Sequence, residues 1–454
     1  MKTFSIENKI KNTALRNSIN NIIEKAKKIH ERPYLYSFTD HGISHSKRML
    51  YCVNALLRGC NNTNLLNEYE CYVLVAAIYL HDIGIQETKD EVLTEFAKEY
   101  DLHYDNTIDK PTFVRKNHHL ISSYIVKQDI KKSAPPLAYD GNSSLGEYIS
   151  LVIESHGINF SENLDFYKNY IFQNEVLRIR LLSILLCLAD CFDCDNRRID
   201  ADKFQYTQFP EISRLHWMKH LYVEGIKFDN RMITISYKFP QLNKTELAIY
   251  KDYFCYETEF WINNIKDTYI NDLNKVNMLF YIKSEVNLSK VVDKINVSDY
   301  NYIEKTITAR IRNSVEFSKY KKIAIGILVN NNKVLMVKRK KPEHACHHSD
   351  SNNVLKWQFP SGIVKEVDAS DEIVIKEVLE ETGIQCSVNQ FLGERIHPDT
   401  LTFCSYYSLN YESGDIFNGD KDENDTVSWV PLENYKSKIT SDIFWSVEDF
   451  LNKR

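Results

Sequence analysis

The decapeptide AAIYLHDIGI, residues 76–85, places an imidazole beside a carboxylate in an otherwise apolar segment. The apolar residues predict a buried helix, and Gly84 favours the end of that helix. A buried charge without a partner is costly, so His81 and Asp82 require a compensating group. The candidates are a hydrogen-bonded partner in the core and a metal ion.

Other polar residues interrupt the apolar helical runs of the first half. With His81 and Asp82 they form a set in which each member, apart from two adjacent pairs, lies on a different predicted helix: His45, His81, Asp82, His118, His119, His156 and Asp190. One such histidine alone is more often an ordinary core or surface residue, but a helical bundle can direct several into one cavity. Imidazole with carboxylate suits Mn, Fe, Co, Ni or Zn, and a carboxylate can bridge two ions. The pattern therefore favours a metal centre.

The 454 residues are enough for about two to three domains. Up to about residue 200 the chain predicts helices joined by polar loops, among them EVLRIRLLSILLCLADCFD, residues 175–193. RMITISYKFP, residues 231–240, alternates as a strand does, and the pattern is helical again from Ile249 to about Phe317. KKIAIGILVNNNKVLMVKRKK, residues 321–341, then predicts two strands around an Asn turn. We expect a helical domain with a small strand-containing extension over residues 1–300, a linker over 301–319 and an α/β domain over 320–454.

The order His, His-Asp, His, His, Asp resembles the HD superfamily of metal-dependent phosphohydrolases. The resemblance spans most of residues 35–200. It is carried by the segments DHGISHSKRML, YLHDIGI, VRKNHHLISS, IESHG and LADCFDCDNRR. It implies an all-α HD-type helical bundle and, because HD phosphohydrolases often assemble, a homo-oligomer.

The HD resemblance also implies a site for two divalent ions, either transition metals or Mg²⁺. The first ion would be held by His45, His81, Asp82 and Asp190. Asp82 would bridge to a second ion, held by His118 and His156. His118 is preferred to His119 because Ser122 follows it at the spacing of the family pattern, and His41 would lie just outside the ligands. We expect catalysis at this site to depend on Asp82 and His118.

Arginines and cysteines lie close to these segments in the sequence. Arg115, Arg197 and Arg198 are candidates for substrate binding because a guanidinium matches phosphate geometry, although structural ion pairs are an equal alternative. Cys187 and Cys191 are spaced one helical turn apart around Asp190. Core packing is therefore a better interpretation of these cysteines than a zinc site.

A second cluster of acidic residues occurs in KEVLEETG, residues 376–383. Glu377, Glu380 and Glu381 stand at helical spacings that gather them on one face. A hard cation such as Mg²⁺ would relieve their mutual repulsion. Gly383 then favours the end of the helix.

GIVKEVDASDEIVIKEVLEETGI, residues 362–384, resembles the Nudix box. The resemblance covers about residues 320–450 and implies an α/β/α Nudix fold with a mixed sheet. It also implies that Mg²⁺ or Mn²⁺ is held by Glu377, Glu380 and Glu381, with catalysis dependent on Glu377 and Glu381. The sequence departs from the family pattern at Ser361, Asp368 and Lys376, where the family has Gly, Glu and Arg. A catalytic domain and a nucleotide sensor both stay open.

Several gross properties bear on partners and location. The formal net charge of −5 argues against stable binding of nucleic acid. No apolar run reaches the roughly 18 residues that span a bilayer, and the N-terminus lacks the apolar core of a signal peptide. Ten scattered cysteines fit a reducing cytoplasm.

These features together predict a metal-dependent nucleotide phosphohydrolase with two modules. The HD module would act on (deoxy)nucleoside triphosphates or phosphoesters, and the Nudix module on nucleoside diphosphate-linked anhydrides. Such fusions suggest nucleotide depletion or signal turnover in anti-phage defence, which nothing in the spacing shows. Three alternatives stay open: an HD phosphohydrolase with the Nudix domain as an allosteric sensor, an HD nuclease, and a non-catalytic nucleotide-binding protein.

Overall fold

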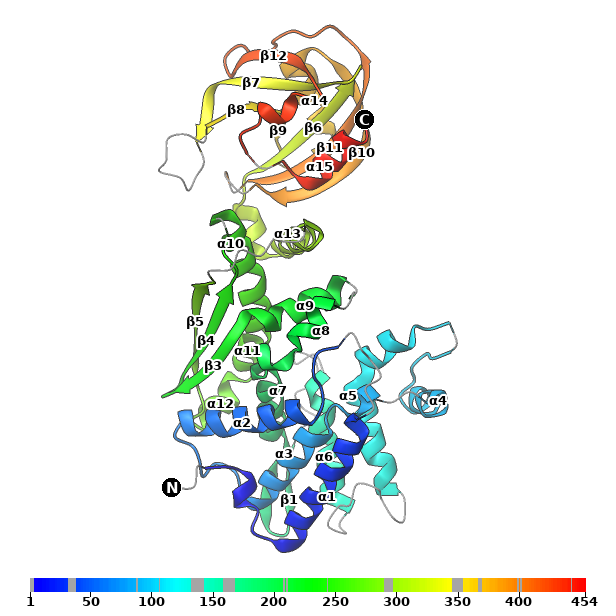
Figure 1. Ribbon diagram of the computed structural model, residues 1–454, viewed down its shortest axis with the longest axis vertical. Helices are drawn as coiled ribbons and strands as arrows, with labels where there is room; N and C mark the ends of the chain where they lie inside the picture. The colour runs from blue at the N-terminus through cyan, green and yellow to red at the C-terminus, as the bar shows by residue number, and fades with distance from the viewer. Residues whose placement is uncertain are drawn as a thin grey trace. The chain divides into compact units, whose positions relative to one another are not determined.

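A computed structural model of the chain divides into two compact units (Figure 1). Unit 1 contains Met1–Asn243 and Tyr250–Asp293, and unit 2 contains Lys244–Ile249 and Lys294–Arg454. The structure describes residues 4–31, 38–86, 89–105, 107–131, 143–157, 168–206, 209, 211–242, 244–289, 297–344, 354–365, 370–397, 400, 402–441 and 443–454. Each unit is described by itself below.

Unit 1 is built around helix α3 (Glu68–Leu80), in which every residue from Glu70 to Leu80 is buried. A helix that is apolar on all sides must be covered on all sides, and neighbouring helices do so. These helices are α1 (Thr13–His30), α2 (Ile43–Gly59), α6 (Ser143–Glu154) and α7 (Ile179–Phe192). α5 (Lys110–Lys131) packs against α6, and α4 (Asp90–Glu99) packs against α5. The prediction of a mostly helical first domain is confirmed.

A capping box fixes the start of α3. The Asn67 side chain accepts from the Glu70 N–H, and the Asn67 N–H donates to Glu70. Glu70 also accepts hydrogen bonds from the guanidinium and the backbone N–H of Arg178. The buried Glu70 carboxylate is thereby fully paired. Because the start of α3 is fixed, the His81–Asp82 pair at the other end of the helix has a defined position.

The segment from Glu175 to Arg178, predicted as the start of a helix, is instead a strand. Strands β1 (Asn169–Phe172) and β2 (Glu175–Arg178) form an antiparallel hairpin, and α7 begins only at Ile179. Gln173 and Asn174 have φ values of 48° and 66°. Positive φ at both central residues defines the tight hairpin turn that the helical periodicity of the flanking residues concealed.

A three-stranded sheet follows the bundle. Strands β3 (Val223–Asp229) and β4 (Met232–Phe239) pair antiparallel, and the strand predicted within residues 231–240 is confirmed. β5 (Tyr281–Leu288) pairs parallel with β4, although its sequence was predicted to be helical. β5 is a mostly exposed edge strand with no buried position, so its sequence lacks a clear period. The helices that precede and follow these strands in the chain are η5 (Asn196–Arg198), α8 (Ala201–Tyr206), α9 (Glu211–Tyr222), α10 (Lys244–Tyr250), the π-helix Lys251–Cys255, α11 (Tyr256–Thr268) and α12 (Ile270–Lys275). Of these helices, α10 falls within unit 2 up to Ile249.

Unit 2 contains a mixed sheet between two helices. Its main strands run in the order β10-β11-β6-β7-β12, with β11 and β6 parallel and the other neighbours antiparallel. Alternate residues of β6 face opposite ways: Ala324 packs in a cluster with Val378 of α14, and Ile325 in another with Val447 of α15. This arrangement confirms the predicted α/β/α architecture. The bounds are β6 (Lys322–Asn330), β7 (Lys333–His344), β8 (Val354–Gln358), β9 (Ser361–Ile363), α14 (Ser370–Thr382), β10 (Gln385–Ile396), β11 (Phe403–Ser413), β12 (Asn424–Pro431) and α15 (Trp445–Asn452).

The segment predicted as a linker, residues 301–319, has helical structure. It contains most of α13 (Val297–Arg312) and the short helix η7 (Val315–Lys319), both within unit 2. Arg395 of β10 forms an ion pair with Glu304 of α13 at 3.8 Å, so this helix packs on the mixed sheet. In the described part of the chain, no helix combines the length and apolar character needed to cross a membrane.

Candidate metal centre and second acidic site

Five segments of unit 1 bring the predicted metal ligands together. α2 supplies His45, the end of α3 supplies His81 and Asp82, and α5 supplies His118. The turn η3 (Ser155–Gly157) after α6 supplies His156, and the last turn of α7 supplies Asp190.

The first group of ligands surrounds one oxygen of Asp82. His45 Nε2 and His81 Nε2 lie 3.6 Å and 3.0 Å from Asp82 Oδ2. The two imidazole nitrogens are 3.2 Å apart, and His45 Nε2 lies 3.3 Å from Asp190 Oδ1. All the atoms named here are of the kinds that bind divalent transition metals.

The second group surrounds the other oxygen of Asp82. His118 Nε2 and His156 Nε2 each lie 3.5 Å from Asp82 Oδ1 and 3.1 Å from one another. Asp82 therefore faces two clusters, one through each carboxylate oxygen. This is the arrangement that a bridging carboxylate between two ions requires.

The second nitrogen of each histidine is already bound elsewhere. Nδ1 of His81, His118 and His156 lies within 2.9 Å of a backbone carbonyl oxygen three residues earlier in the chain. A carbonyl only accepts, so each Nδ1 carries the proton and each Nε2 presents a lone pair. The burial of His118, beside His156, lowers its pKa to about 4, which keeps it neutral at pH 7. Lone pairs facing one another and a carboxylate need a cation between them, so these residues fit a metal.

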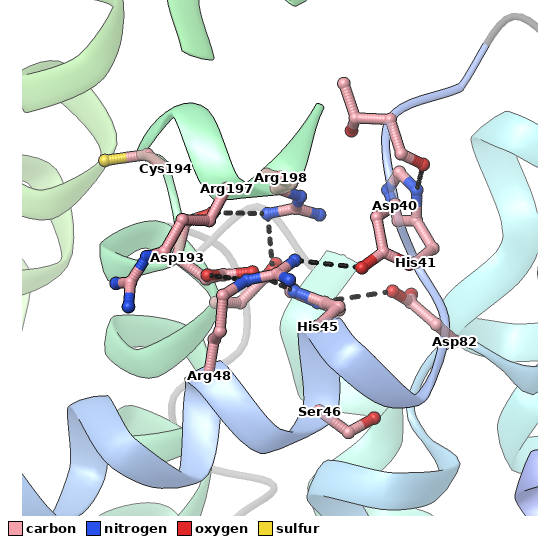
Figure 2. A network of polar contacts seen from close by, with 12 residues as sticks. Asp40, His41, His45, Ser46, Arg48, Asp82, Asp193, Cys194, Arg197 and Arg198 are labelled. Carbon is pink, nitrogen blue, oxygen red and sulfur yellow. Dashed lines mark hydrogen bonds and ion pairs between the residues drawn. The ribbon is translucent and has the colours of Figure 1, made fainter. Parts of the chain in front are cut away.

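Asp193 orients His45 from behind and was not predicted from the sequence. Its Oδ2 accepts from His45 Nδ1 at 2.6 Å, and its Oδ1 accepts from Arg48 Nε at 2.7 Å (Figure 2). Burial opposes ionisation of Asp193, but the hydrogen bond from His45 and nearby arginines hold its pKa at about 2. Arg48 in turn pairs with Asp40 at 3.1 Å. A carboxylate behind a ligating histidine is a common second layer of metal sites.

The neighbouring histidines have other environments. His119 is buried against Gly157, and its Nδ1 has no hydrogen-bond partner among the described residues. The structure thus brings His118, and not His119, to Asp82. His41 places Nδ1 2.7 Å from the Thr39 carbonyl oxygen and lies beside the ligands, where no described metal group includes it.

The three predicted phosphate-binding arginines lie in different places. Arg198 is buried, and its guanidinium lies 3.4 Å from Asp190 Oδ1. Arg197 is mostly exposed and forms a bidentate pair with Asp195. Arg115 stacks over the Phe38 ring at 4.1 Å and donates to Ser213 of α9. Arg115 therefore contacts neither metal group.

A pocket of about 430 Å³ opens beside both metal groups. One side is formed by Asp82, His118, His156 and Asp190, and another by residues of α9 and α11. The α9 residues His216, Lys219 and His220 line it together with Arg198, and they were not predicted. Their spacing of three and four residues on one helix is the signal that could have identified them.

The α9 side of this pocket is rich in nitrogen. His220 Nδ1 lies 2.9 Å from the Cys194 carbonyl oxygen, which leaves the buried Nε2 without a partner in the described structure. Burial lowers the pKa of Lys219 and that of His220. Cys187, Cys191 and Cys194 also line the pocket, but no described metal group includes these cysteines.

The three predicted carboxylates of the second unit have different surroundings. Glu381 is buried and accepts from the Ser361 N–H at 3.1 Å, whereas Glu380 is exposed and pairs with Lys376 at 3.5 Å. The only groups of three metal-binding side chains among the described residues lie in unit 1. Glu380 turns away because its position on α14 faces solvent, where Lys376 one turn earlier reaches it. Asp368, the other departure from the Nudix pattern, lies outside the described residues.

Glu377 and Glu381 nevertheless share one environment. Gly362 packs so tightly that an added Cβ would lie 2.1 Å from Glu377 Cγ. Burial raises the pKa of Glu381 to about 7 and also raises that of Glu377. The hydrogen bond to Glu381 comes from the backbone N–H of Ser361. The presence of serine where the family has glycine therefore leaves this hydrogen bond intact.

Two charged residues beside these glutamates were not predicted. Arg339 of β7 forms an ion pair with Glu423, and both charges act on Glu377. A small pocket of about 90 Å³ also begins at Ser361 and is lined by Trp357, Phe359 and Arg395. Aromatic rings and a guanidinium are suited to bind a nucleotide.

Comparison with known proteins identifies both units. A family model for HD-CE matches residues 35–275, which is more than half of the chain. The chain belongs to the HD-CE family. A NUDIX domain model matches residues 320–445. The predicted fusion of an HD-type domain with a Nudix domain is confirmed, and the candidate metal centre lies in the HD-CE part.

The individual relatives found resemble the Nudix part of this HD-CE protein. An ADP-ribose pyrophosphatase of Methanocaldococcus jannaschii is 30% identical over 115 residues, which are 25% of this chain and 62% of that protein. An ADP-ribose pyrophosphatase structure from Streptococcus suis is 16% identical, with a TM-score of 0.22, over 29% of this chain and 90% of that chain. The MutT protein structure from Methanosarcina mazei is 22% identical, with a TM-score of 0.23, over 30% and 91%. The chain spans less than two thirds of the length of the curated relative from Methanocaldococcus jannaschii.

Proposed function

We propose that this protein is a metal-dependent nucleotide phosphohydrolase with an active HD-CE centre. The observation that carries the proposal is the convergence of His Nε2 atoms on both oxygens of Asp82, with every Nδ1 bound elsewhere. His45, His81, Asp82 and Asp190 would hold one ion, and Asp82, His118 and His156 a second. Bound divalent cations would neutralise phosphoryl oxygens and acidify water for attack on phosphorus.

Basic side chains that line the pocket would bind and orient the phosphates of the substrate. Arg198 lies beside Asp190 and lines the pocket, so its guanidinium can reach a phosphate at the metal groups. Lys219 and His216 line the same pocket from α9 and would bind the phosphates farther from the bond that breaks. These positive and neutral nitrogen groups favour a nucleoside triphosphate or phosphoester over a neutral substrate.

We propose a second activity for the Nudix domain, the cleavage of the anhydride in a nucleoside diphosphate-linked compound. The match with a protein named ADP-ribose pyrophosphatase makes ADP-ribose the first substrate to test. Glu377 and Glu381 would hold Mg²⁺ or Mn²⁺, and Arg339, whose charge acts on both glutamates, would contact a phosphate. Glu380 would have to turn from Lys376 to join them.

A panel of nucleotides, separated by chromatography after incubation with Mn²⁺ or Mg²⁺, tests the HD-CE activity. Asp82→Ala should abolish hydrolysis of triphosphates or phosphoesters, because both ions lose their shared ligand. The matched control is Asp229→Asn, an exposed acid of β3 in the same unit. If the wild type converts no member of the panel, or if the Asp82 variant converts the same members, the HD-CE proposal is wrong.

The same panel with ADP-ribose tests the Nudix activity. Glu381→Gln should abolish the release of AMP from ADP-ribose and leave the HD-CE products unchanged. Glu372→Gln, an exposed acid of the same helix, is the control. Undiminished AMP release by Glu381→Gln would contradict a catalytic role for this site.

The exposed position of Glu380 favours one other function for the Nudix domain, that of an allosteric nucleotide sensor. In this case Glu381→Gln would leave all hydrolysis intact and abolish the stimulation of the HD-CE activity by one nucleotide. A single set of assays with and without added nucleotide separates the two functions.

We place the activity in the cytoplasm and in a homo-oligomer, with a role in nucleotide depletion or signal turnover during defence against phage. The free state of the described cysteines supports a reducing compartment. Sedimentation of the purified protein tests the assembly, and a phage challenge of cells carrying wild type or Asp82→Ala tests the role.

A further inference from the structure

A second pocket adjoins the metal centre of the HD-CE domain. It has a volume of about 360 Å³, within the range of small-molecule sites. His41 and Arg198 line both this pocket and the pocket at the metal groups, so they form the boundary between the two. A ligand held at the metals by Arg198 would therefore have a second cavity beside it.

Three buried polar atoms without partners belong to residues that line this second pocket. They are His30 Nδ1, Thr39 Oγ1 and Arg198 Nε, none of which has a hydrogen-bond partner in the described structure. Thr39 is 4% exposed. Leaving a buried donor or acceptor unpaired costs about 1–3 kcal/mol, so native proteins rarely do so without a reason. A ligand that hydrogen-bonds to these atoms would supply the reason.

The other walls of the pocket are apolar or balanced in charge. Phe38, Ile85 and Trp217 provide flat and apolar surface. Asp200 lies in the same wall as Lys203. Asp40 is already paired with Arg48, and the guanidinium of Arg197 is already bound to Asp195. This composition does not suit a polyphosphate. It suits a planar ring with hydrogen-bonding edges and apolar faces, which is the chemistry of a nucleobase.

We propose that this pocket binds the nucleoside part of the substrate, whose phosphates lie at the metal groups. Thr39 and His30 then determine which base is accepted, and Arg198 spans the junction between nucleoside and phosphates. This inference rests on the proposed HD-CE activity and adds to it the residues that select the substrate. It accounts for the unpaired atoms and for the sharing of Arg198 between the two pockets.

Kinetics with and without a base test the proposal. Thr39→Val removes the hydroxyl and keeps the shape. It should lower kcat/KM for the preferred nucleoside triphosphate about tenfold, the effect of one lost hydrogen bond to a ligand. The same variant should hydrolyse inorganic tripolyphosphate, which has no base, at the wild-type rate. Thr234→Val, the same change in strand β4, should alter neither rate.

The proposal would be overturned if Thr39→Val lost activity equally on the nucleoside triphosphate and on tripolyphosphate. It would also be overturned if the variant kept the wild-type order of preference among the bases. The proposal is also wrong if Thr39→Val spares hydrolysis and instead abolishes stimulation by an added nucleoside. That result would make the pocket a regulatory site.

Binding of nucleosides without phosphates separates this proposal from the proposed activity. In protein stripped of metal with EDTA, saturation-transfer NMR should detect contact between the protein and one nucleoside. Asp82→Ala should retain the signal and Thr39→Val should lose it. If no triphosphate is hydrolysed but this binding holds, the proposed activity fails and the pocket stands. If hydrolysis occurs but no nucleoside binds, or binds equally to Thr39→Val, the pocket proposal fails alone.

Discussion

At the scale of single residues, Asp193 shows how much of a metal site lies behind its ligands. The carboxylate holds His45 Nδ1 at 2.6 Å and thereby points Nε2 at Asp82. Asp193→Asn keeps the size but removes the negative charge that stabilises the orientation. We expect metal affinity to fall roughly 10- to 100-fold, the usual effect of losing such a partner.

Isothermal titration of the EDTA-treated protein with Mn²⁺ measures this change. Asp229→Asn should bind Mn²⁺ as the wild type does, because Asp229 is exposed on β3. Wild-type affinity in Asp193→Asn would mean that the backbone of α2 alone orients His45.

In the Nudix domain, Gly362 limits the position of the Glu377 side chain. A Cβ there would lie 2.1 Å from Glu377 Cγ, so Gly362→Ala must displace the Glu377 side chain. A displacement of about 1 Å commonly lowers a rate by about 10²-fold, and we expect this loss in AMP release from ADP-ribose. Gly225→Ala, where an added Cβ would meet nothing within 4 Å, is the control. Full activity in Gly362→Ala would show that the position of Glu377 is unimportant for the reaction.

The histidines and carboxylates that converge on Asp82 were predictable as a set because each interrupts an apolar helical run, as His81 and Asp82 do. Asp193 was not, because an acid next to the polar segment at residues 194–198 has the pattern of a solvated residue. The α9 residues were missed for a different reason. Their spacing of three and four residues marks one face of a helix, but only the packing of α9 places that face at the pocket beside the metal groups.

At the scale of elements, the close contact between η2 (Ile83–Gln86) and α5 sets the distance between Asp82 and His118. A Cβ at Gly84 would lie 2.4 Å from the His118 carbonyl oxygen and 2.7 Å from the Ser122 backbone nitrogen. Backbone atoms cannot rotate away as a side chain can. The added methyl group of Gly84→Ala should therefore push η2 away from α5. We expect the second ion to be lost and the first retained, with a decrease of about 1–3 kcal/mol in the free energy of unfolding.

Metal content by mass spectrometry and urea unfolding measure the two effects. The control is Gly59→Ala at the end of α2, where the added Cβ has ordinary contacts of 3.7 Å or more. Two ions per chain in Gly84→Ala would show that α5 can move without loss of the site.

The main helices and the paired Nudix strands were predictable because their apolar residues repeat with a clear period. The β1–β2 hairpin was not, since its turn depends on positive φ at Gln173 and Asn174, and neither is glycine. β5 was missed because its pairing partner, β4, lies more than forty residues earlier in the chain.

At the scale of the whole molecule, both units contain histidines that are neutral because they are buried. Burial lowers the pKa of His30 to about 4 and that of His41 and His397 to about 3. The unfolded chain has histidines with a pKa near 6.5, so between pH 6.5 and these values it binds more protons than the folded chain. Stability is therefore complete above about pH 6.5 and is lost as the pH falls, by at most about 1.4 kcal/mol per pH unit for each histidine.

Urea unfolding in EDTA at pH 7 and pH 5 tests this dependence without a contribution from metal release. His397→Asn should lose less stability than the wild type between the two values. His103→Asn, at a position 77% exposed, should lose as much as the wild type. An equal loss in all three proteins would assign the acid sensitivity to other groups.

The two-unit organisation followed from the change of pattern near residue 320, because a helical period gives way there to alternating strands. The change of pattern did not indicate the residue at which the second unit begins. Residues 301–319 are polar enough to resemble a linker, yet α13 uses its few apolar positions to pack on the mixed sheet.

The thiols around the metal-centre pocket have a practical consequence for the handling of the enzyme. Burial raises the pKa of Cys194 to about 12 and also raises that of Cys187 and Cys191. A thiol that stays protonated reacts slowly with oxidants and alkylating agents. These three thiols therefore need no protection by dithiothreitol, a reductant that would itself compete for the divalent ions under study.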